Sequence, residues 1–160
     1  MFPIDEYKKN LRAFRALMLR HRTLAHERLE GDRWTLAEMV GHLVDSAANN
    51  HQRFVRLQLE RELEFPAYDG DAWLRASKAD SCDYRLLVRL WTEYNGYLLH
   101  IAERMDEGCL GWTWKTAEGE LTLDFLVRDY YRHLEWHREL FERRVGEIRA
   151  RRKNGSTFPG

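Results

Sequence analysis

The spacing of apolar residues at the start of the chain predicts an amphipathic helix. Apolar side chains recur there every three or four positions, which places them on one buried face of a helix. These residues are Ile4, Tyr7, Leu11, Phe14, Met18 and Ala25. We expect the helix to run from about Asp5 into the high twenties, because Gly31 and Asp32 then interrupt the pattern.

A second helix is predicted from Thr35 to about Glu62. Thr35 and Glu38 have the spacing of a capping box, in which each side chain satisfies a backbone N–H group of the first turn. Pro66 cannot continue a helix, so the helix must end before it. The apolar face consists of Leu36, Met39, Val40, Leu43, Ala47, Phe54 and Leu57.

Two further helices are predicted in the second half of the chain. The third is capped by Ser81 or Asp83 and ends at Gly108. Its apolar stripe is Leu86, Leu90, Tyr94, Tyr97, Leu98, Ile101 and Met105. The fourth helix begins at Thr122, and its apolar stripe is Leu123, Leu126, Val127, Tyr130, Leu134, Phe141, Val145 and Ile148.

Two long connections join these helices. Residues 65–81 contain Pro66 and the turn-forming pair Asp69–Gly70, and long ordered loops of this kind often cover functional sites. Residues 112–121 fit either a small hairpin that turns at Glu118–Gly119 or a loop anchored by aromatic residues. The sequence therefore predicts an all-α fold, a four-helix bundle with long connections between helices two and three and between helices three and four. We expect one domain over residues 1–153 and a disordered tail over residues 154–160.

Composition and charge narrow the class of protein. Lys and Arg together equal Asp and Glu at 26 each, so no net field attracts nucleic acid, and we expect no nucleic-acid partner. No stretch approaches the roughly 18 consecutive apolar residues of a membrane span, and the N-terminus lacks the unbroken apolar centre of a secretion signal. We therefore expect a cytoplasmic protein without a membrane partner. Cys82 and Cys109 are too few for a disulfide framework and are expected to be reduced.

Three histidines are candidate metal ligands. His133 and His137 are four residues apart, so their imidazoles project from one face of the fourth helix, as a chelating pair requires. His42 lies at the edge of the apolar face of the second helix, in a polar stripe with Asp45, Ser46, Asn49 and Arg53. The alternative is that the histidines are partly exposed side chains that hydrogen-bond to their neighbours.

Two segments of the sequence resemble the DinB/YfiT-like superfamily. The segment Trp34–Ser46, which reads WTLAEMVGHLVDS, and its continuation to Phe54 are similar to the second helix of that family. The segment LTLDFL at residues 121–126, followed by HLEWH at residues 133–137, is similar to the last bundle helix, which supplies a histidine pair four apart. Many members carry a further histidine beside the second of the pair, where this chain has Trp136.

The resemblance implies a four-helix bundle with a three-histidine site for one divalent metal ion, zinc or nickel, and frequently a homodimer. His42, His133 and His137 occupy the matching positions. Iron and copper also accept imidazole ligands. Three such ligands leave a coordination position open, as in a catalytic site. Asp45 and Asp129 each lie about one turn from a ligand, where they either accept its second ring proton or remain solvated.

The chemistry implied by the superfamily is transfer of a low-molecular-weight thiol to an electrophile on a small-molecule substrate, or isomerisation assisted by such a thiol. Asn49 and Arg53 are candidates for orienting the substrate or the thiol. A hydrolase that uses a metal-bound water needs the same ligands. A stress-related metal-binding protein without turnover, and an interaction module without metal, are the alternatives from other classes.

Overall fold

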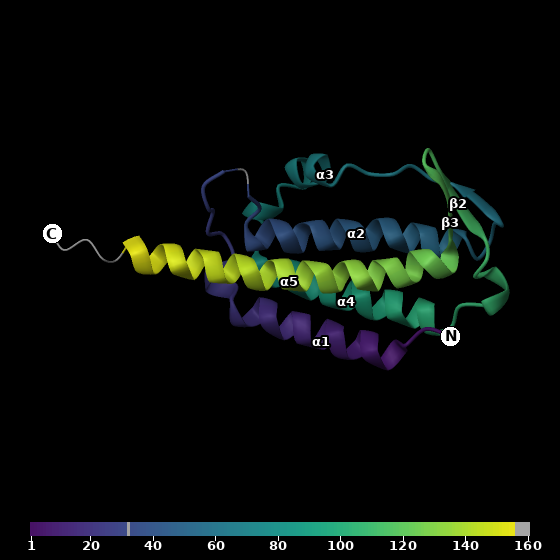
Figure 1. The fold of residues 1–160 in the computed structure, drawn as a ribbon, viewed down its shortest axis with the longest axis horizontal. Helices are drawn as coiled ribbons and strands as arrows, with labels where there is room; N and C mark the ends of the chain where they lie inside the picture. Colours follow the sequence, from purple (N-terminus) through teal and green to yellow (C-terminus); the bar gives the residue numbers. More distant parts are fainter. Residues whose placement is uncertain (32, 156–160) are drawn as a thin grey trace.

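The computed structural model describes residues 1–31 and 33–155, and four long helices form its bundle (Figure 1). They are α1 (Ile4–Arg20), α2 (Leu36–Arg56), α4 (Tyr84–Glu103) and α5 (Leu123–Gly155). Both α4 and α5 pack against α2, and the same two helices pack against α1. Helices α1 and α2 therefore lie diagonally opposite each other, as do α4 and α5, and the predicted four-helix bundle is confirmed.

Aromatic side chains from three helices meet in the core. Phe14 of α1 makes edge-to-face contacts with Trp91 of α4 and with Phe141 of α5, at centroid separations of 5.3 and 5.8 Å. All three side chains are almost completely buried. Burial of one such side chain stabilises the fold by about 1.5–3 kcal/mol, so this cluster contributes strongly to holding α1 in the bundle.

The first helix is shorter than predicted. It ends at Arg20, His21 caps it, and a 3₁₀ turn follows at Arg22–Leu24. The prediction that it reaches the high twenties was wrong. Ala25 is buried and continues the apolar spacing, but it lies beyond the end of the helix. Its carbonyl instead accepts a hydrogen bond of 2.9 Å from the N–H group of Ala37 and so joins the turn to α2.

The predicted capping box opens α2. The Glu38 N–H group donates to the Thr35 hydroxyl at 3.1 Å, and the Thr35 N–H group donates to the Glu38 carboxylate at 2.7 Å. The helix ends at Arg56, well before the predicted limit at Glu62. The predicted limit was wrong because Glu62–Glu64 pairs with a distant strand instead of continuing the helix.

Both long connections contain regular structure. Strand β1 (Glu62–Glu64) pairs in parallel with β2 (Thr113–Thr116), which forms an antiparallel hairpin with β3 (Gly119–Thr122), so the hairpin alternative is confirmed. This sheet lies at one end of the bundle (Figure 1). Between β1 and α4, the chain forms α3 (Gly70–Ser77), which lies along the outside of α2, and then a 3₁₀ turn at Ala79–Ser81.

The buried face of helix α4 matches the predicted stripe only in part, since Leu98 and, just beyond the helix, Met105 are buried as expected. Asp83 caps the helix by accepting the Leu86 N–H group at 2.7 Å. Leu86, Leu90 and Tyr97 were expected in the core, but 44%, 46% and 52% of their surface is exposed. Apolar residues occupy two adjacent stripes of this helix, and the core takes the stripe that carries Trp91. The buried apolar residues are Tyr84, Leu87, Val88, Trp91, Leu98, Leu99 and Ala102.

Helix α5 follows the prediction closely, since all eight residues of its predicted stripe are buried. It extends through Gly155, two residues into the segment expected to be a tail, and residues 156–160 lie outside the described part. Both cysteines are free thiols, as expected. Across residues 1–31 and 33–155, no helix has the length and apolar character needed to cross a bilayer.

Two glycines allow a matched test of the packing over α2. A Cβ atom on Gly41 would lie 2.3 Å from the Ala79 side chain, whereas one on Gly96, within α4, would meet no atom within 4 Å. We expect Gly41→Ala to lower the free energy of unfolding by about 1–3 kcal/mol through overpacking. Gly96→Ala should raise it by about 0.5–1 kcal/mol through helix propensity. Urea unfolding measures both, and equal effects would contradict the close contact.

Candidate metal centre

The three candidate histidines converge between α2 and α5. One ring nitrogen from each of His42, His133 and His137 lies within 4.8 Å of the others. Ring centroids are 4.9 Å apart for His42 and His137, and 4.4 Å apart for the pair on α5. The Nε2 atoms of His133 and His137 are 2.9 Å apart. The structure therefore brings together the three residues that the sequence singled out.

Packing of the two helices sets this convergence. On α5, Tyr130 and Leu134 are buried in the core and fix the rotation of the helix, so the flank beside them carries His133 and His137 toward α2. On α2, the buried Leu43 fixes the rotation in the same way, and His42 lies at the edge of the buried face. The helical register alone thus directs all three rings to one point.

Burial keeps the cluster uncharged at neutral pH. His42 and His137 are 9% and 2% exposed. Burial, followed by the proximity of His133, lowers the pKa of His42 to about 4 and that of His137 to about 3. Burial also lowers the pKa of His133, while Asp129 opposes that shift. Neutral imidazole is the form that ligates a metal ion.

The donor set fits a divalent ion. Two Nε2 atoms in contact repel each other unless one carries a proton, and a cation between them would remove that conflict. The Nδ1 atoms of His42 and His137 are buried and lack a hydrogen-bond partner within the described residues. Three imidazoles suit zinc, nickel, copper or iron, so the chemistry of the donors supports a metal but does not select one.

Aromatic and backbone groups enclose the cluster. Trp34 lies 4.8 Å from His42 and Trp136 lies 4.7 Å from His137, measured between ring centroids. At the start of α3, a Cβ atom on Gly70 would lie 3.1 Å from the His42 ring, so a larger residue there would require that ring to shift by a few tenths of an ångström. The connection between the second and third predicted helices thus covers the site.

The two candidate aspartates lie near the cluster without bonding to it. Asp129 is 44% exposed and accepts a hydrogen bond from Arg132. Asp45 is partly buried, and burial raises the pKa of its carboxyl to about 6. Its Oδ2 atom is buried and makes no hydrogen bond to any of the residues described. In the described part of the chain neither carboxyl hydrogen-bonds to a histidine of the cluster, so their role as proton acceptors stays a prediction.

The polar stripe of α2 continues from His42 toward the sheet. Asn49 is 4% exposed, and its side-chain amide donates to the Asp45 carbonyl at 2.9 Å. Arg53 is 8% exposed, and its guanidinium carbon lies 3.9 Å from the centroid of the Trp114 ring. The structure thus places both predicted substrate-orienting residues in the interior, beside the covering connection.

Tyr68 is the site residue that sequence reasoning missed. Its ring centroid lies 6.4 Å from that of His42, and its phenol lies close to the Ser46 side chain. Burial raises the pKa of this phenol. Nothing in the local pattern of residues 65–69 indicates this contact. The clue available from sequence was that the connection was long enough to cover a site.

A cavity of about 410 Å³ lies beside this residue, large enough for a small molecule. It is lined by Asn49, Gln52, Phe65, Tyr68, Trp73 and Tyr94, among others.

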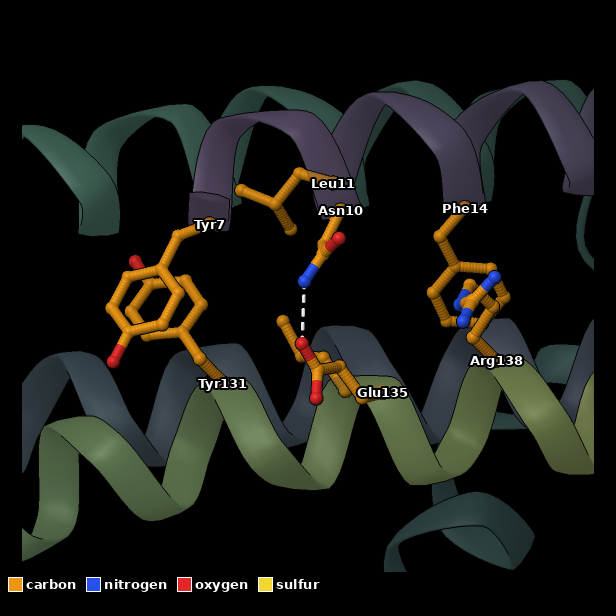
Figure 2. A pocket seen from close by; sticks show the side chains of 8 residues that line it. Tyr7, Asn10, Leu11, Phe14, Tyr131, Glu135 and Arg138 are labelled. Carbon is orange, nitrogen blue, oxygen red and sulfur yellow. Dashed lines mark hydrogen bonds between the residues drawn. The ribbon is translucent and has the colours of Figure 1, made fainter. Parts of the chain in front are cut away.

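A second hollow, between α1 and α5, is too small to bind a substrate. Figure 2 shows Tyr7 stacked on Tyr131, with Asn10 hydrogen-bonded to Glu135 beside them. Its volume is about 10 Å³, about enough for one water molecule. The cavity next to Tyr68 is therefore the better candidate for a substrate site.

Two solved structures share this fold. YfiT from Bacillus subtilis, described as a probable metal-dependent hydrolase with an unusual four-helix bundle topology, matches with a TM-score of 0.75 and 20% identity over 91% of this chain and 90% of its own. The mycothiol-dependent maleylpyruvate isomerase matches with a TM-score of 0.62 and 15% identity over 86% of this chain and 60% of its own.

No protein-family model matches the sequence, and no curated protein matches it. At these identities the structural likeness establishes a shared fold, which agrees with the resemblance to the DinB/YfiT-like superfamily.

The buried histidines predict a pH dependence of stability in the metal-free protein. The pKa of His137 is about 3 in the fold against an ordinary 6.5, so between these values unfolding takes up a proton. Lowering the pH from 7 to 5 should therefore cost about 2 kcal/mol through this residue. His137→Gln should lose less stability over the same interval, measured by urea unfolding in the presence of a chelator.

Exposed His100 provides the control for this comparison. His100→Gln should keep the full pH dependence of the parent protein. The raised pKa of Asp45 makes the free energy of unfolding change with pH in the opposite direction. This contribution is the same in every variant, so it cancels when the variants are compared. Equal slopes for the parent and His137→Gln would contradict the burial of a neutral imidazole.

Proposed function

We propose that this protein is a metal-dependent enzyme that acts on a small molecule, with His42, His133 and His137 as the ligands of one divalent ion. The observation that carries the proposal is the convergence of three neutral imidazoles from two helices, with ring nitrogens within 4.8 Å of one another. The cavity beside Tyr68 supports a substrate site close by. Zinc and nickel are the proposed ions.

The number of donors favours catalysis over a purely structural ion. Among the described residues, the group that can hold a metal contains three donors and no fourth ligand. Structural sites are normally closed by four protein ligands, whereas catalytic sites keep a position open. A stress-related metal-binding protein without turnover therefore fits the geometry less well.

The leading reaction is transfer of a low-molecular-weight thiol to an electrophile, or isomerisation assisted by such a thiol. When bound, the ion would lower the pKa of the thiol so that the thiolate forms at neutral pH. Asn49 and Arg53 would orient the substrate or the thiol, and Asp45, with a pKa of about 6, would accept or return a proton nearby. The thiol-dependent isomerase that shares the fold supports this choice.

Hydrolysis is the second candidate, and it uses the same ligands with water at the open position. The hydrolase that shares the fold supports it. Incubation of the metal-loaded protein with an activated ester, with and without a thiol, separates the two reactions. Turnover that needs the thiol supports transfer, and turnover without it supports hydrolysis.

We also propose that the protein forms a homodimer through α4. Leu86, Leu90 and Tyr97 are exposed on one side of this helix, where a second copy would cover them. A large apolar stripe exposed to water is more typical of an interface than of a monomer surface.

Metal content tests the ligand assignment. We expect the purified protein, free of any histidine tag, to hold about one equivalent of divalent metal by elemental analysis. His137→Ala should lose nearly all of it and should also lose the rise in melting temperature that metal gives the parent. His100→Ala removes an exposed histidine of α4 and should keep the full metal content. Unchanged metal in His137→Ala would exclude the proposed triad.

Oligomeric state tests the α4 interface. Leu90→Glu should convert the dimer to a monomer in analytical ultracentrifugation, because a charge cannot be buried at the centre of an apolar contact. Leu59→Glu changes a residue outside α4 that is 76% exposed, and it should leave the dimer intact. A parent protein that sediments as a monomer would rule out the interface.

A further inference from the structure

Arg53 is a buried cation that has no anionic partner in the part of the chain that the structure describes. It is 8% exposed, and its hydrogen bond to a protein group is a long one, from Nη1 to the Asn50 side-chain oxygen at 3.4 Å. Its Nε atom is buried and has no partner within the described residues. Arg144 is equally buried, yet its Nε donates to the Glu147 carboxylate at 3.0 Å. A buried arginine in this fold can therefore pair with a carboxylate, so burial alone does not explain why Arg53 lacks such a partner among the described residues.

The edge of the Arg53 guanidinium that makes no hydrogen bond among the described residues has the shape that a carboxylate recognises. Nη1 is used by Asn50, and one face of the group lies on the Trp114 ring at 3.9 Å. The remaining edge, Nε with Nη2, carries two parallel N–H groups. Two parallel donors bind both oxygens of a carboxylate at once, and this fork geometry distinguishes arginine from lysine. Stacking on Trp114 holds that edge in a fixed orientation.

The position of Arg53 links it to the histidine cluster. It lies eleven residues after His42 on the same polar stripe of α2, a rise of about 16 Å along the helix axis. Tyr68 spans part of this interval. Asp45 raises and Arg53 lowers the pKa of its phenol, so the hydroxyl group lies within the electrostatic reach of both. Tyr68 and Asn49 line the cavity of about 410 Å³, and Arg53 lies next to it, one residue after Gln52 of the same lining.

We infer that Arg53 binds the carboxylate of a small acidic substrate, or of an acidic thiol co-substrate, whose reacting end lies at the histidine cluster. This inference rests on the proposed function and names the class of ligand for the same site. The rise along α2 requires several bonds between the carboxylate and the reacting atom, so the site selects elongated acids over the shortest ones. Arg53 would act as a binding residue that sets the orientation of the ligand.

Binding of simple thiols to the cobalt-loaded full chain tests the inference. The probes are ω-mercaptoalkanoic acids of increasing length and their methyl esters, and the absorbance of the sulfur–cobalt contact in the near ultraviolet reports their Kd. We expect the acid to bind about tenfold more tightly than its ester at an intermediate chain length, the effect of hydrogen bonds to a charged group. Mercaptoacetate, the shortest acid, should show no preference.

Substitutions then assign the preference to one side chain. Arg53→Gln should bind acid and ester equally, while the Kd of the ester stays unchanged. Arg53→Lys should recover only a small part of the preference for the acid, because lysine is charged but lacks the two parallel donors of arginine. Arg56→Gln is the matched control, since Arg56 lies one turn away and is exposed. It should keep the full preference for the acid.

The outcomes separate this inference from the proposed function. Failure to bind cobalt contradicts the proposed metal centre itself. Cobalt and thiol binding with equal affinity for acid and ester at every length overturns the role of Arg53 and leaves it a structural cation on Trp114. Tighter binding of a matched thiol phosphonate than of the acid overturns the choice of a carboxylate. The comparison of acid with ester in the parent protein stands even if Arg53→Gln does not fold.

Discussion

The contact between α2 and α5 is the constraint on which the site depends. Neither helix carries a complete ligand set, because His42 comes from one and the histidine pair from the other. The apolar residues beside the histidines, such as Leu43 and Leu134, are buried and fix the rotation of both helices. A slip of one residue in either helix would turn its histidines by about 100° and disperse the cluster. The packing of the core between α2 and α5 therefore also determines the geometry of the site.

The fold stabilises polar groups that are expensive to bury. His42, the Asp45 carboxyl and the Arg53 guanidinium lie along the α2 stripe, and His133 and His137 face it from α5. Several of these groups have buried atoms without a partner among the described residues. Each such group costs free energy relative to water. A protein retains groups of this kind at binding sites, where a ligand supplies the missing interaction. These groups gather at the polar stripe of α2, while the buried apolar residues of the same helix, such as Leu43, pack in the core and stabilise the fold.

The sequence was sufficient to predict the parts of the fold that depend on local rules. The capping box at Thr35 and the stripe of α5 follow from spacing, and so does the pairing of His133 with His137. The parts that failed depend on distant partners. Strand β1 exists because β2 is beside it, fifty residues later in the chain. The face of α4 was ambiguous because Leu90 and Trp91 are adjacent and either stripe could be buried.

The same distinction applies to the site. The superfamily resemblance connected His42 with the pair on α5, which spacing within one helix could not do. Tyr68 was not predictable because its contact with Ser46 depends on the path of an irregular segment across α2. The isolation of Arg53 could not be seen in the sequence either, because the absence of a carboxylate partner is a property of the whole packed interior.

The segment that carries Tyr68 is anchored on both sides. On one side β1 is joined to the sheet by backbone hydrogen bonds, and on the other the 3₁₀ turn at Ala79 presses against Gly41. The segment between these two attachments is therefore held at both ends over α2. Because both ends are held, a ligand can enter beneath this segment only if a few residues in its middle move outward. The segment cannot swing about one end. The number of residues between the two attachments therefore limits how far this segment can lift from α2.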